Sequence, residues 1–344
     1  MIRLHHRRVQ QTGGSTLTVS LPKSWAERFG LGRGGELIEV EGDDGPLILM
    51  PKNVALSDGE LVIEPGTTLE QATRMLISLY LAGYETIVVS DKGGVAIQRA
   101  LKNLIRRWLV GVEVVDERLD GMVLSVMRLY ENLTPLTVLE RMGTMAANMV
   151  YDSLSLLENP SPEEVADLLD RDDEVDRFYH YLLRSVNASL IDPRTLRAVE
   201  VSDPQVLIGY TLVARSVERV ADHATNIASI SLDKSWKFEP ISDFYNICLE
   251  SGQTFRNAVE LVLRPDHRSA LKSLEDTDEL ITRLELSFSE LQSKCSRHDP
   301  IVLYRMLFDN VKRVVEYSMD VSEIALNLTT PKPKMTPIKR PSGS

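Results

Sequence analysis

Cysteine is almost absent from this chain of 344 residues. Cys248 and Cys295 are the only two, and neither belongs to a CxxC pair or to a Cys/His cluster. That absence excludes a zinc site of the finger or ribbon type. It also excludes a disulfide framework, which fits a protein of a reducing compartment.

Long hydrophobic runs are missing as well. The most apolar stretch, 75–90, is interrupted by Gly83 and Glu85 and is too short and too broken to span a bilayer. No apolar run follows the first residues, so we expect no signal peptide. There is also no GxSxG motif, no Ser/His/Asp grouping and no P-loop. We therefore expect a cytoplasmic protein that neither inserts into a membrane nor acts as an enzyme.

Positive charge is in deficit over the whole chain, with 39 basic against 50 acidic residues and a net charge of −11. This excludes a protein that coats nucleic acid with its whole surface. The first 35 residues reverse the balance, because Glu27 is their only acid while their basic residues are Arg3, Arg7, Arg8, Lys23, Arg28 and Arg33. The asymmetry favours a local DNA-binding face, and the alternative is ordinary surface charge on a dimerisation module.

Short β-like runs with turn residues between them occupy 1–53. Strands are predicted at 17–21, 37–41 and 47–50, with a hairpin turn at 42–45. Ser24 is expected to cap a short helix over 25–29, and Gly30 to end it. One hairpin and one short helix cannot bury a sizeable core, so we predict at least a homodimer through this segment.

Strand and helix patterns alternate over 60–129. The order is βαβαββ, with a helix that begins after Thr67 or Thr68, and both helices are long enough to connect parallel strands. This small α/β domain has no role that its residues reveal. Its second helix bears a basic stripe, for which a solvated face is favoured over a DNA or anion contact: Arg99, Lys102, Arg106 and Arg107.

Apolar residues recur at helical spacing from 135 to 329. Proline-containing breaks divide this region into six helices in two sets of three, 135–232 and 240–329, which we interpret as two related three-helix bundles. The Pro-, Lys- and Ser-rich tail, 330–344, is predicted to be disordered. The predicted fold class is multidomain α+β: a β-domain, a small α/β domain and an all-α region.

The segment 217–228, with the sequence VERVADHATNIA, resembles the signature helix of PhoU, the phosphate-transport regulator. The resemblance implies two tandem three-helix bundles whose E/DxxxD pairs can bind metal clusters. In the first bundle the matching residues are Asp172, Asp176, Glu218 and Asp222. In the second bundle Lys312 and Ile281 replace acids, which argues against a second site. His223, beside the last acid, is expected to pack between helices rather than to bind a cation.

Acids four residues apart lie on one helix face, and sets of oxygen ligands suit Mg, Mn, Fe or Zn ions to different degrees. A divalent or trivalent ion is therefore one interpretation of the four carboxylates. A solvated acidic face is the other, since 170–176 is a dense acidic run. A metal-dependent hydrolase is the least favoured alternative.

The N-terminal segment is similar to the SpoVT–AbrB domain, on the evidence of Arg8-Val9-Gln10, the run 13–25 with its Leu21-Pro22-Lys23 turn, and Gly35-Glu36. The resemblance implies an intertwined swapped-hairpin β-barrel dimer that binds DNA, here through Arg3, Arg7, Arg8, Lys23 and Arg28. Joined to a PhoU-like region, it resembles archaeal PhoU-type transcription regulators.

These resemblances together predict a DNA-binding regulator of phosphate uptake. Its helical region would sense phosphate status through a transporter ATPase or a sensor protein. The alternative is a PhoU-type adaptor that does not bind DNA, with an N-terminal domain that only dimerises.

Overall fold

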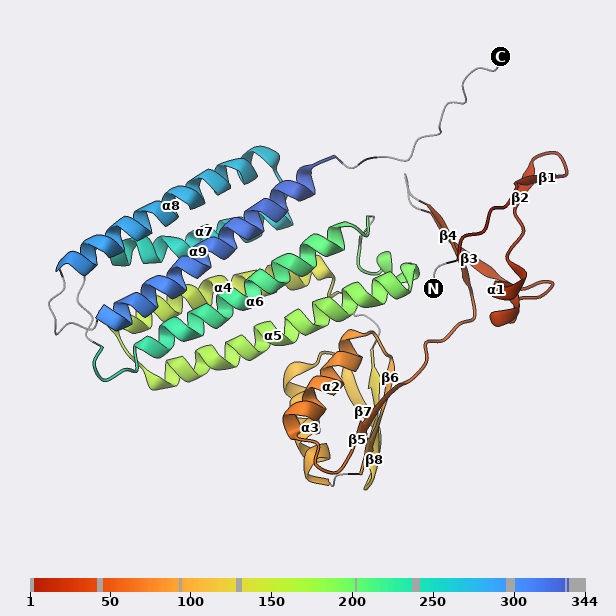
Figure 1. Cartoon of the computed structure of the whole chain (residues 1–344), viewed down its shortest axis with the longest axis horizontal. Coiled ribbons are helices and arrows are strands. Elements are labelled where there is room, and N and C mark those ends of the chain that lie inside the picture. The colour runs from red at the N-terminus through yellow and green to blue at the C-terminus, as the bar shows by residue number, and fades with distance from the viewer. Residues whose placement is uncertain are drawn as a thin grey trace, which may run out of the picture. The chain divides into compact units, whose positions relative to one another are not determined.

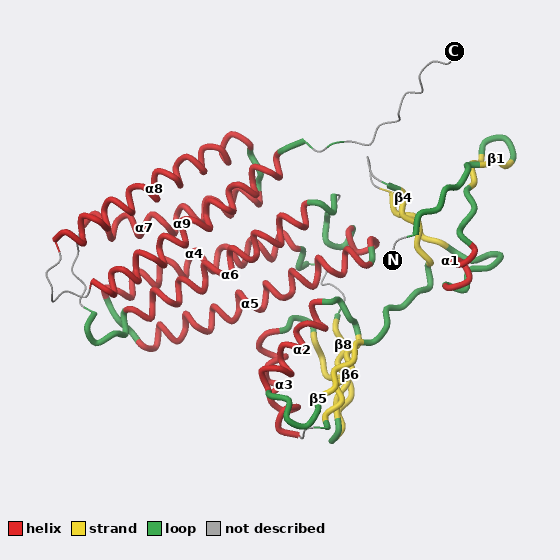
Figure 2. The backbone as a smooth tube through the Cα atoms, viewed as in Figure 1, coloured by secondary structure: helices red, strands yellow, loops and turns green. Residues whose placement is uncertain are grey.

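The computed structural model describes residues 3–41, 46–92, 95–127, 132–201, 203–236, 242–294, 301–331 and 333. The chain divides into two compact units, Met1–Leu56 with Pro333–Ser344, and Ser57–Lys332. Strands gather in the first unit and in a small layer of the second, while long helices make up the rest of the second (Figure 2). The fold class is multidomain α+β, as predicted. The disordered tail predicted at 330–344 lies largely outside the described residues.

The N-terminal unit consists of two antiparallel strand pairs and one short helix. In chain order its elements are β1 (Gln10–Thr12), β2 (Thr16–Thr18), α1 (Lys23–Arg28), β3 (Leu37–Glu41) and β4 (Leu47–Pro51). Strands β3 and β4 pair along their full length, from Leu37 opposite Pro51 to Glu41 opposite Leu47. The turn predicted between them, 42–45, lies outside the described residues.

Two details of this unit correct the sequence prediction. Ser24 lies inside α1, because the helix begins at Lys23 after Pro22, which makes no side-chain cap hydrogen bond. The Pro22 carbonyl instead accepts the backbone N–H groups of Trp25 and Ala26. The first predicted strand also differs, since β2 ends at Thr18 and 19–22 has no regular structure. Gly30 has a positive φ of 62°, which suits the predicted helix end.

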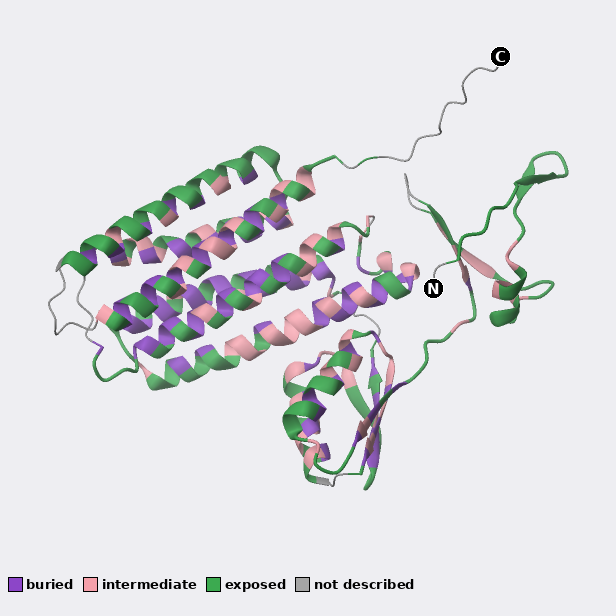
Figure 3. Cartoon of the chain, in the orientation of Figure 1, coloured by how far each residue is buried: buried purple, intermediate pink, exposed green. Residues whose placement is uncertain are grey.

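The described residues of the N-terminal unit form no hydrophobic core of their own. Among the described residues of 3–53, Pro51 alone is buried, and Figure 3 shows this part of the chain as exposed or half-buried. Large apolar side chains are exposed to solvent, such as Leu17 with 71% of its surface exposed and Val9 with 64%. A strand pair of this size needs a further partner to be stable.

The second unit opens with an α/β layer in the predicted βαβαββ order. Its elements are β5 (Gly59–Ile63), α2 (Leu69–Leu81), β6 (Thr86–Asp91), α3 (Val95–Trp108), β7 (Val112–Arg118) and β8 (Gly121–Val126). The sheet order is β5-β6-β8-β7, with β5 and β6 parallel and the other pairs antiparallel. Both helices pack on the sheet over a core that includes Leu61, Leu76 and Leu101.

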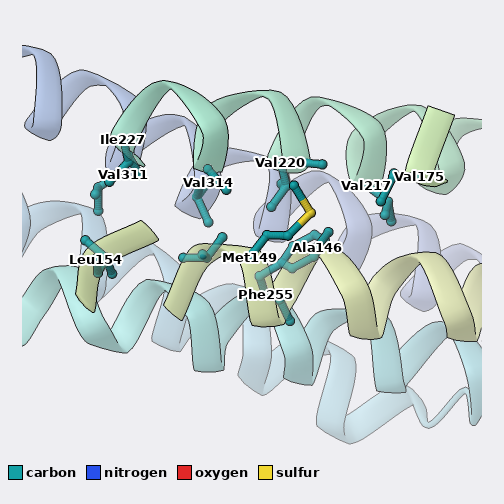
Figure 4. Packing of buried hydrophobic residues seen from close by; sticks show 14 of the residues in the cluster. Ala146, Met149, Leu154, Val175, Val217, Val220, Ile227, Phe255, Val311 and Val314 are labelled. Carbon is teal, nitrogen blue, oxygen red and sulfur yellow. The ribbon is translucent and has the colours of Figure 1, made fainter. Parts of the chain in front are cut away.

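Six long helices follow, in the two sets of three that the proline breaks predict (Figure 1). They are α4 (Pro135–Glu158), α5 (Pro162–Ile191), α6 (Val206–Ile230), α7 (Ser242–Leu263), α8 (His267–Lys294) and α9 (Ile301–Thr329), with a short 3-10 turn, η1 (Pro193–Leu196), after α5. One hydrophobic core runs through both sets. Figure 4 shows Met149 of α4, Val220 of α6 and Phe255 of α7 within it. The two sets therefore pack against each other through α4, α6, α7 and α9.

Within the described part of the chain, no helix combines the length and the apolar character needed to cross a membrane.

Candidate functional sites

The basic residues predicted to contact DNA all lie at exposed positions of the N-terminal unit. Arg3, Arg7 and Arg8 precede β1, whereas Lys23 and Arg28 lie on α1. Lys23 has 89% of its side chain exposed, and its Nζ lies 3.7 Å from a carboxylate oxygen of Glu27. An exposed pair of this kind contributes little to stability, so the lysine can exchange this partner for a phosphate.

The four acids predicted from helical spacing come together between two helices. Asp172 and Asp176 lie on α5, Glu218 and Asp222 lie on α6, and these helices pack against each other. Partial burial, followed by the charges of Asp222 and Asp176, raises the pKa of Asp172 to about 7. Burial and Asp222 raise the pKa of Asp176 to about 6. The pairs therefore form one electrostatic unit, which we call the acidic cluster.

Glu218 is partly buried at the helix interface. Its side chain is 13% exposed, and its Oε1 accepts a hydrogen bond from Arg215 Nη1 at 2.9 Å. Burial raises the pKa of Glu218 to about 7, against the opposing effect of Arg215. The other oxygen, Oε2, is buried without a hydrogen-bond partner. Sequence reasoning missed Arg215, although its position three residues before Glu218 was a visible signal.

The acidic cluster fits a metal ion in the kind of its donors but not in their spacing. Carboxylate oxygens are suitable ligands for hard cations, and Glu218 has an oxygen in need of a partner. Yet no group of three or more His, Cys, Asp or Glu residues in the described ranges lies close enough together to hold an ion. Metal binding therefore stays a prediction for Asp172, Asp176, Glu218 and Asp222.

The equivalent region of the second helix set is neutralised by cations. Lys312 Nζ lies 2.5 Å from Glu285 Oε1 and 4.0 Å from Glu316 Oε1. Arg313 adds a contact of 2.9 Å to Glu316. Where the first set brings carboxylates together, the second set forms an ion-pair network around Lys312.

His223 packs between α6 and α9 rather than pointing into the acidic cluster. Its Nδ1 lies 2.8 Å from Asn310 Oδ1 on α9, and its ring stacks on Tyr317 with 5.8 Å between centroids. These contacts are those of the helix-packing histidine that the sequence favours.

Comparisons with known protein families identify two separate segments. Residues 139–231, which span α4 to α6, match the PhoU domain. Residues 10–57 match the family described as antidote-toxin recognition MazE, bacterial antitoxin. Neither match includes the α/β layer.

Proteins similar to this chain include two phosphate-specific transport system accessory protein PhoU homologs. The one from Caulobacter vibrioides is 32% identical over 93 residues, which cover 27% of this chain and 37% of that protein. The other, PhoU homolog 1 of Mycobacterium tuberculosis, is 25% identical over 193 residues, which cover 49% of this chain and 83% of that protein. These relatives are bacterial, so an archaeal source stays a prediction.

A solved structure of PhoU from Pseudomonas aeruginosa is also similar, at 15% sequence identity and a TM-score of 0.44, over 56% of this chain and 93% of that one.

Proposed function

We propose that this chain, which is PhoU-like and has an N-terminal domain of the AbrB type, is a cytoplasmic DNA-binding regulator of phosphate uptake. The observation behind the proposal is the contrast between its parts. An exposed basic unit whose described residues form no core is joined to a helical unit that contains a PhoU domain, in a chain with a net charge of −11.

In this proposal a second copy of the chain covers the exposed apolar side chains of the N-terminal unit. Pairing two copies buries residues such as Leu17 and Val9, which are exposed in a single copy, and doubles the number of cations on the DNA-binding unit. Most of the affinity for DNA then comes from contacts between Arg or Lys and backbone phosphates, and it falls as salt is added.

The helical unit is proposed to act as the sensory or partner-binding part rather than as an enzyme. Its partner would be a phosphate-transporter ATPase or a sensor protein, and the similarity to accessory proteins of phosphate-specific transport systems supports a partner of this kind. The acidic cluster would respond to a divalent or trivalent cation, which would have to draw Asp172, Asp176, Glu218 and Asp222 closer together than they lie in the structure. A cation there would offset the mutual repulsion of the carboxylates.

The proposal is tested by sequencing the DNA that co-purifies with the full chain from cells grown at high and at low phosphate. We expect enrichment of fragments upstream of phosphate-transport genes, with a yield that depends on phosphate. A matched variant, Lys23→Ala with Arg8→Ala, should lose most of the DNA while remaining folded. If the full chain retains no DNA and shows no salt-sensitive binding to such fragments, the chain is an adaptor rather than a DNA-binding regulator.

A further inference from the structure

Polar side chains form a continuous stripe on the face of α5 that meets the α/β layer. They are spaced by four and three residues in alternation, which places them on one side of the helix. We call them the polar stripe: Asp173, Arg177, His180, Arg184 and Asn187. The contacts of three members fix the direction of the stripe. Asp173 pairs with Arg107 of α3, whereas Arg184 and Asn187 each donate a hydrogen bond of 2.7 Å to the end of α2, at the carbonyls of Tyr80 and Leu81.

Arg184 is the most enclosed member of the polar stripe, with 1% of its surface exposed. Its Nη1 donates to the Tyr80 carbonyl, and its guanidinium lies 5.0 Å from the centroid of the Tyr80 ring. Nε and Nη2 are buried without any hydrogen-bond partner. These two nitrogens form the edge of the guanidinium whose parallel N–H groups bind carboxylate or phosphate through two hydrogen bonds. The part of Arg184 best suited to an anion therefore has no acceptor among the protein groups described.

Other buried donors without acceptors lie where α5 meets the α/β layer, a contact that we call the seam. Arg177 Nε and Trp108 Nε1, from α5 and α3, have no hydrogen-bond partner. The charges of Arg184 and Arg177 both act on Tyr80, so the two guanidinium groups lie around one side chain. His180 donates to the backbone carbonyl of Trp108, and burial lowers its pKa. Its buried Nδ1 is therefore an unpartnered acceptor and does not add to these donors. In the described part of the chain, neither Arg177 nor Arg184 lies within ion-pair distance of a carboxylate, and the charge of Glu85 acts on Arg184 only from farther away.

A buried guanidinium cannot relieve this situation by losing its proton, because arginine stays charged in proteins. Buried donors are normally paired, and a buried charge requires an opposite charge or strong acceptors. A planar carboxylate would satisfy only the parallel edge of Arg184. A tetrahedral oxyanion also offers oxygens in other directions, which suits the additional donors on Arg177 and Trp108.

We propose that the seam between the polar stripe of α5 and the end of α2 binds a small tetrahedral oxyanion, such as inorganic phosphate, through the parallel edge of Arg184 and through Arg177. The anion bridges the α/β layer and the PhoU-like helices, so its binding strengthens the contact between them. The site lies outside the acidic cluster and the N-terminal unit, and it does not depend on DNA binding.

The test is isothermal titration calorimetry of the full chain with inorganic phosphate, in the presence of chelator so that no metal ion mediates the contact. Sodium chloride at matched ionic strength is the blank. We expect saturable binding and an increase in Tm with phosphate, and comparable behaviour with sulfate. Absence of both heat and stabilisation would mean that water fills the seam, and would overturn the proposal. Acetate binding as tight as phosphate binding would equally overturn the tetrahedral assignment.

Variants locate the site. Arg184→Lys keeps the charge but removes the parallel edge, and should weaken phosphate binding by about tenfold or more, as the loss of charge-assisted hydrogen bonds implies. Arg177→Met, at a half-buried position that tolerates substitution better, should weaken binding as well. Asn187→Ala is the matched control, because it removes a seam hydrogen bond without removing a cation, and its affinity should stay near that of the parent chain. Unchanged affinity in both arginine variants would place the anion elsewhere.

Discussion

At the scale of single residues, the acidic cluster is the feature whose chemistry is best defined. Three of its four carboxyls have pKa values raised to about 6 or 7, mainly by burial and then by one another. Each group binds its proton more tightly in the folded chain than in the unfolded chain. The folded state is therefore favoured at low pH and loses that advantage as these groups ionise.

The raised pKa values predict how the stability of the protein changes with pH. Stabilisation from Asp172, Asp176 and Glu218 is fully present below pH 4 and is lost as pH rises through about 6 to 7. Glu218→Gln should flatten this slope and, at pH 8, raise the free energy of unfolding by about 1 kcal/mol after allowance for solvent screening. The pH dependence of the free energy of unfolding is measured by urea unfolding in the presence of chelator, over a range of about pH 5 to 8 that spans these titrations. Glu174→Gln, which changes an exposed acid on α5 next to Asp172 and Asp176, is the control and should leave the slope unchanged.

A cation prediction follows from the same residues. If Mn²⁺ or Fe²⁺ binds the acidic cluster, the free energy of unfolding should rise by about 2.7 kcal/mol at a hundred-fold excess over Kd, with an increase in Tm, and chelator should reverse it. Asp222→Asn should remove most of this response and slightly stabilise the metal-free protein. Glu316→Gln should retain the response, because Lys312 and Arg313 already neutralise Glu316. A solvated acidic face would give no metal-dependent shift in calorimetry.

At the scale of elements, local chemistry accounts for most of what could be predicted from the sequence. Proline breaks located the ends of the six long helices because proline disrupts a helix interior. Gly83, with a positive φ of 94°, marks the end of α2 as expected. The cap of α1 was placed wrongly, since both Pro22 and Ser24 suit a helix start and only the backbone geometry distinguishes them.

Contacts between distant segments explain what could not be predicted. The four-residue spacing predicts that Asp172 and Asp176 share one helix face and that Glu218 and Asp222 share another. Whether the two pairs come close together depends on how α5 packs against α6. The 170–176 run looks like one solvated acidic face in the sequence. In the structure Asp170 and Asp173 pair with Arg107 of α3, while Asp172 and Asp176 turn to α6. Arg107 belongs to the basic stripe for which a solvated face is favoured, and it remains 57% exposed while it pairs with Asp170.

The cap of α2 gives a prediction at this scale. Thr68 accepts a hydrogen bond from the Gln71 backbone N–H, and the Gln71 side chain accepts one from the Thr68 backbone. Thr68→Ala should therefore lower the free energy of unfolding by about 1 kcal/mol, the usual contribution of a helix cap. Thr67→Ala removes the neighbouring hydroxyl without touching the cap and should have a much smaller effect. Equal losses from the two variants, measured by urea unfolding, would contradict this assignment.

At the scale of the whole molecule, the two units differ in self-sufficiency. The unit Ser57–Lys332 contains both hydrophobic cores, whereas Met1–Leu56 has almost no buried residue among those described. We therefore expect Ser57–Lys332 to fold as a single copy and the N-terminal unit to require a partner surface.

Association is expected to depend on the N-terminal unit. A chain that begins at Ser57 should be folded but should sediment as a monomer, while the full chain sediments as a dimer or larger. The full chain with Lys23→Ala and Arg8→Ala is the matched control and should remain associated, because both residues are exposed and charged. A truncated chain that stays fully dimeric at low concentration would place the association surface in the helical unit.

In the proposed function the N-terminal unit holds DNA through the backbone phosphates. This is tested by fluorescence anisotropy of a labelled duplex, titrated with the full chain over a series of salt concentrations. The affinity should fall steeply with salt, and Lys23→Ala or Arg8→Ala should each weaken binding to all sequences alike and reduce the salt slope by about one. The chain that begins at Ser57 should not bind. Undiminished binding by that truncated chain, or no salt-sensitive binding by the full chain, would contradict the account.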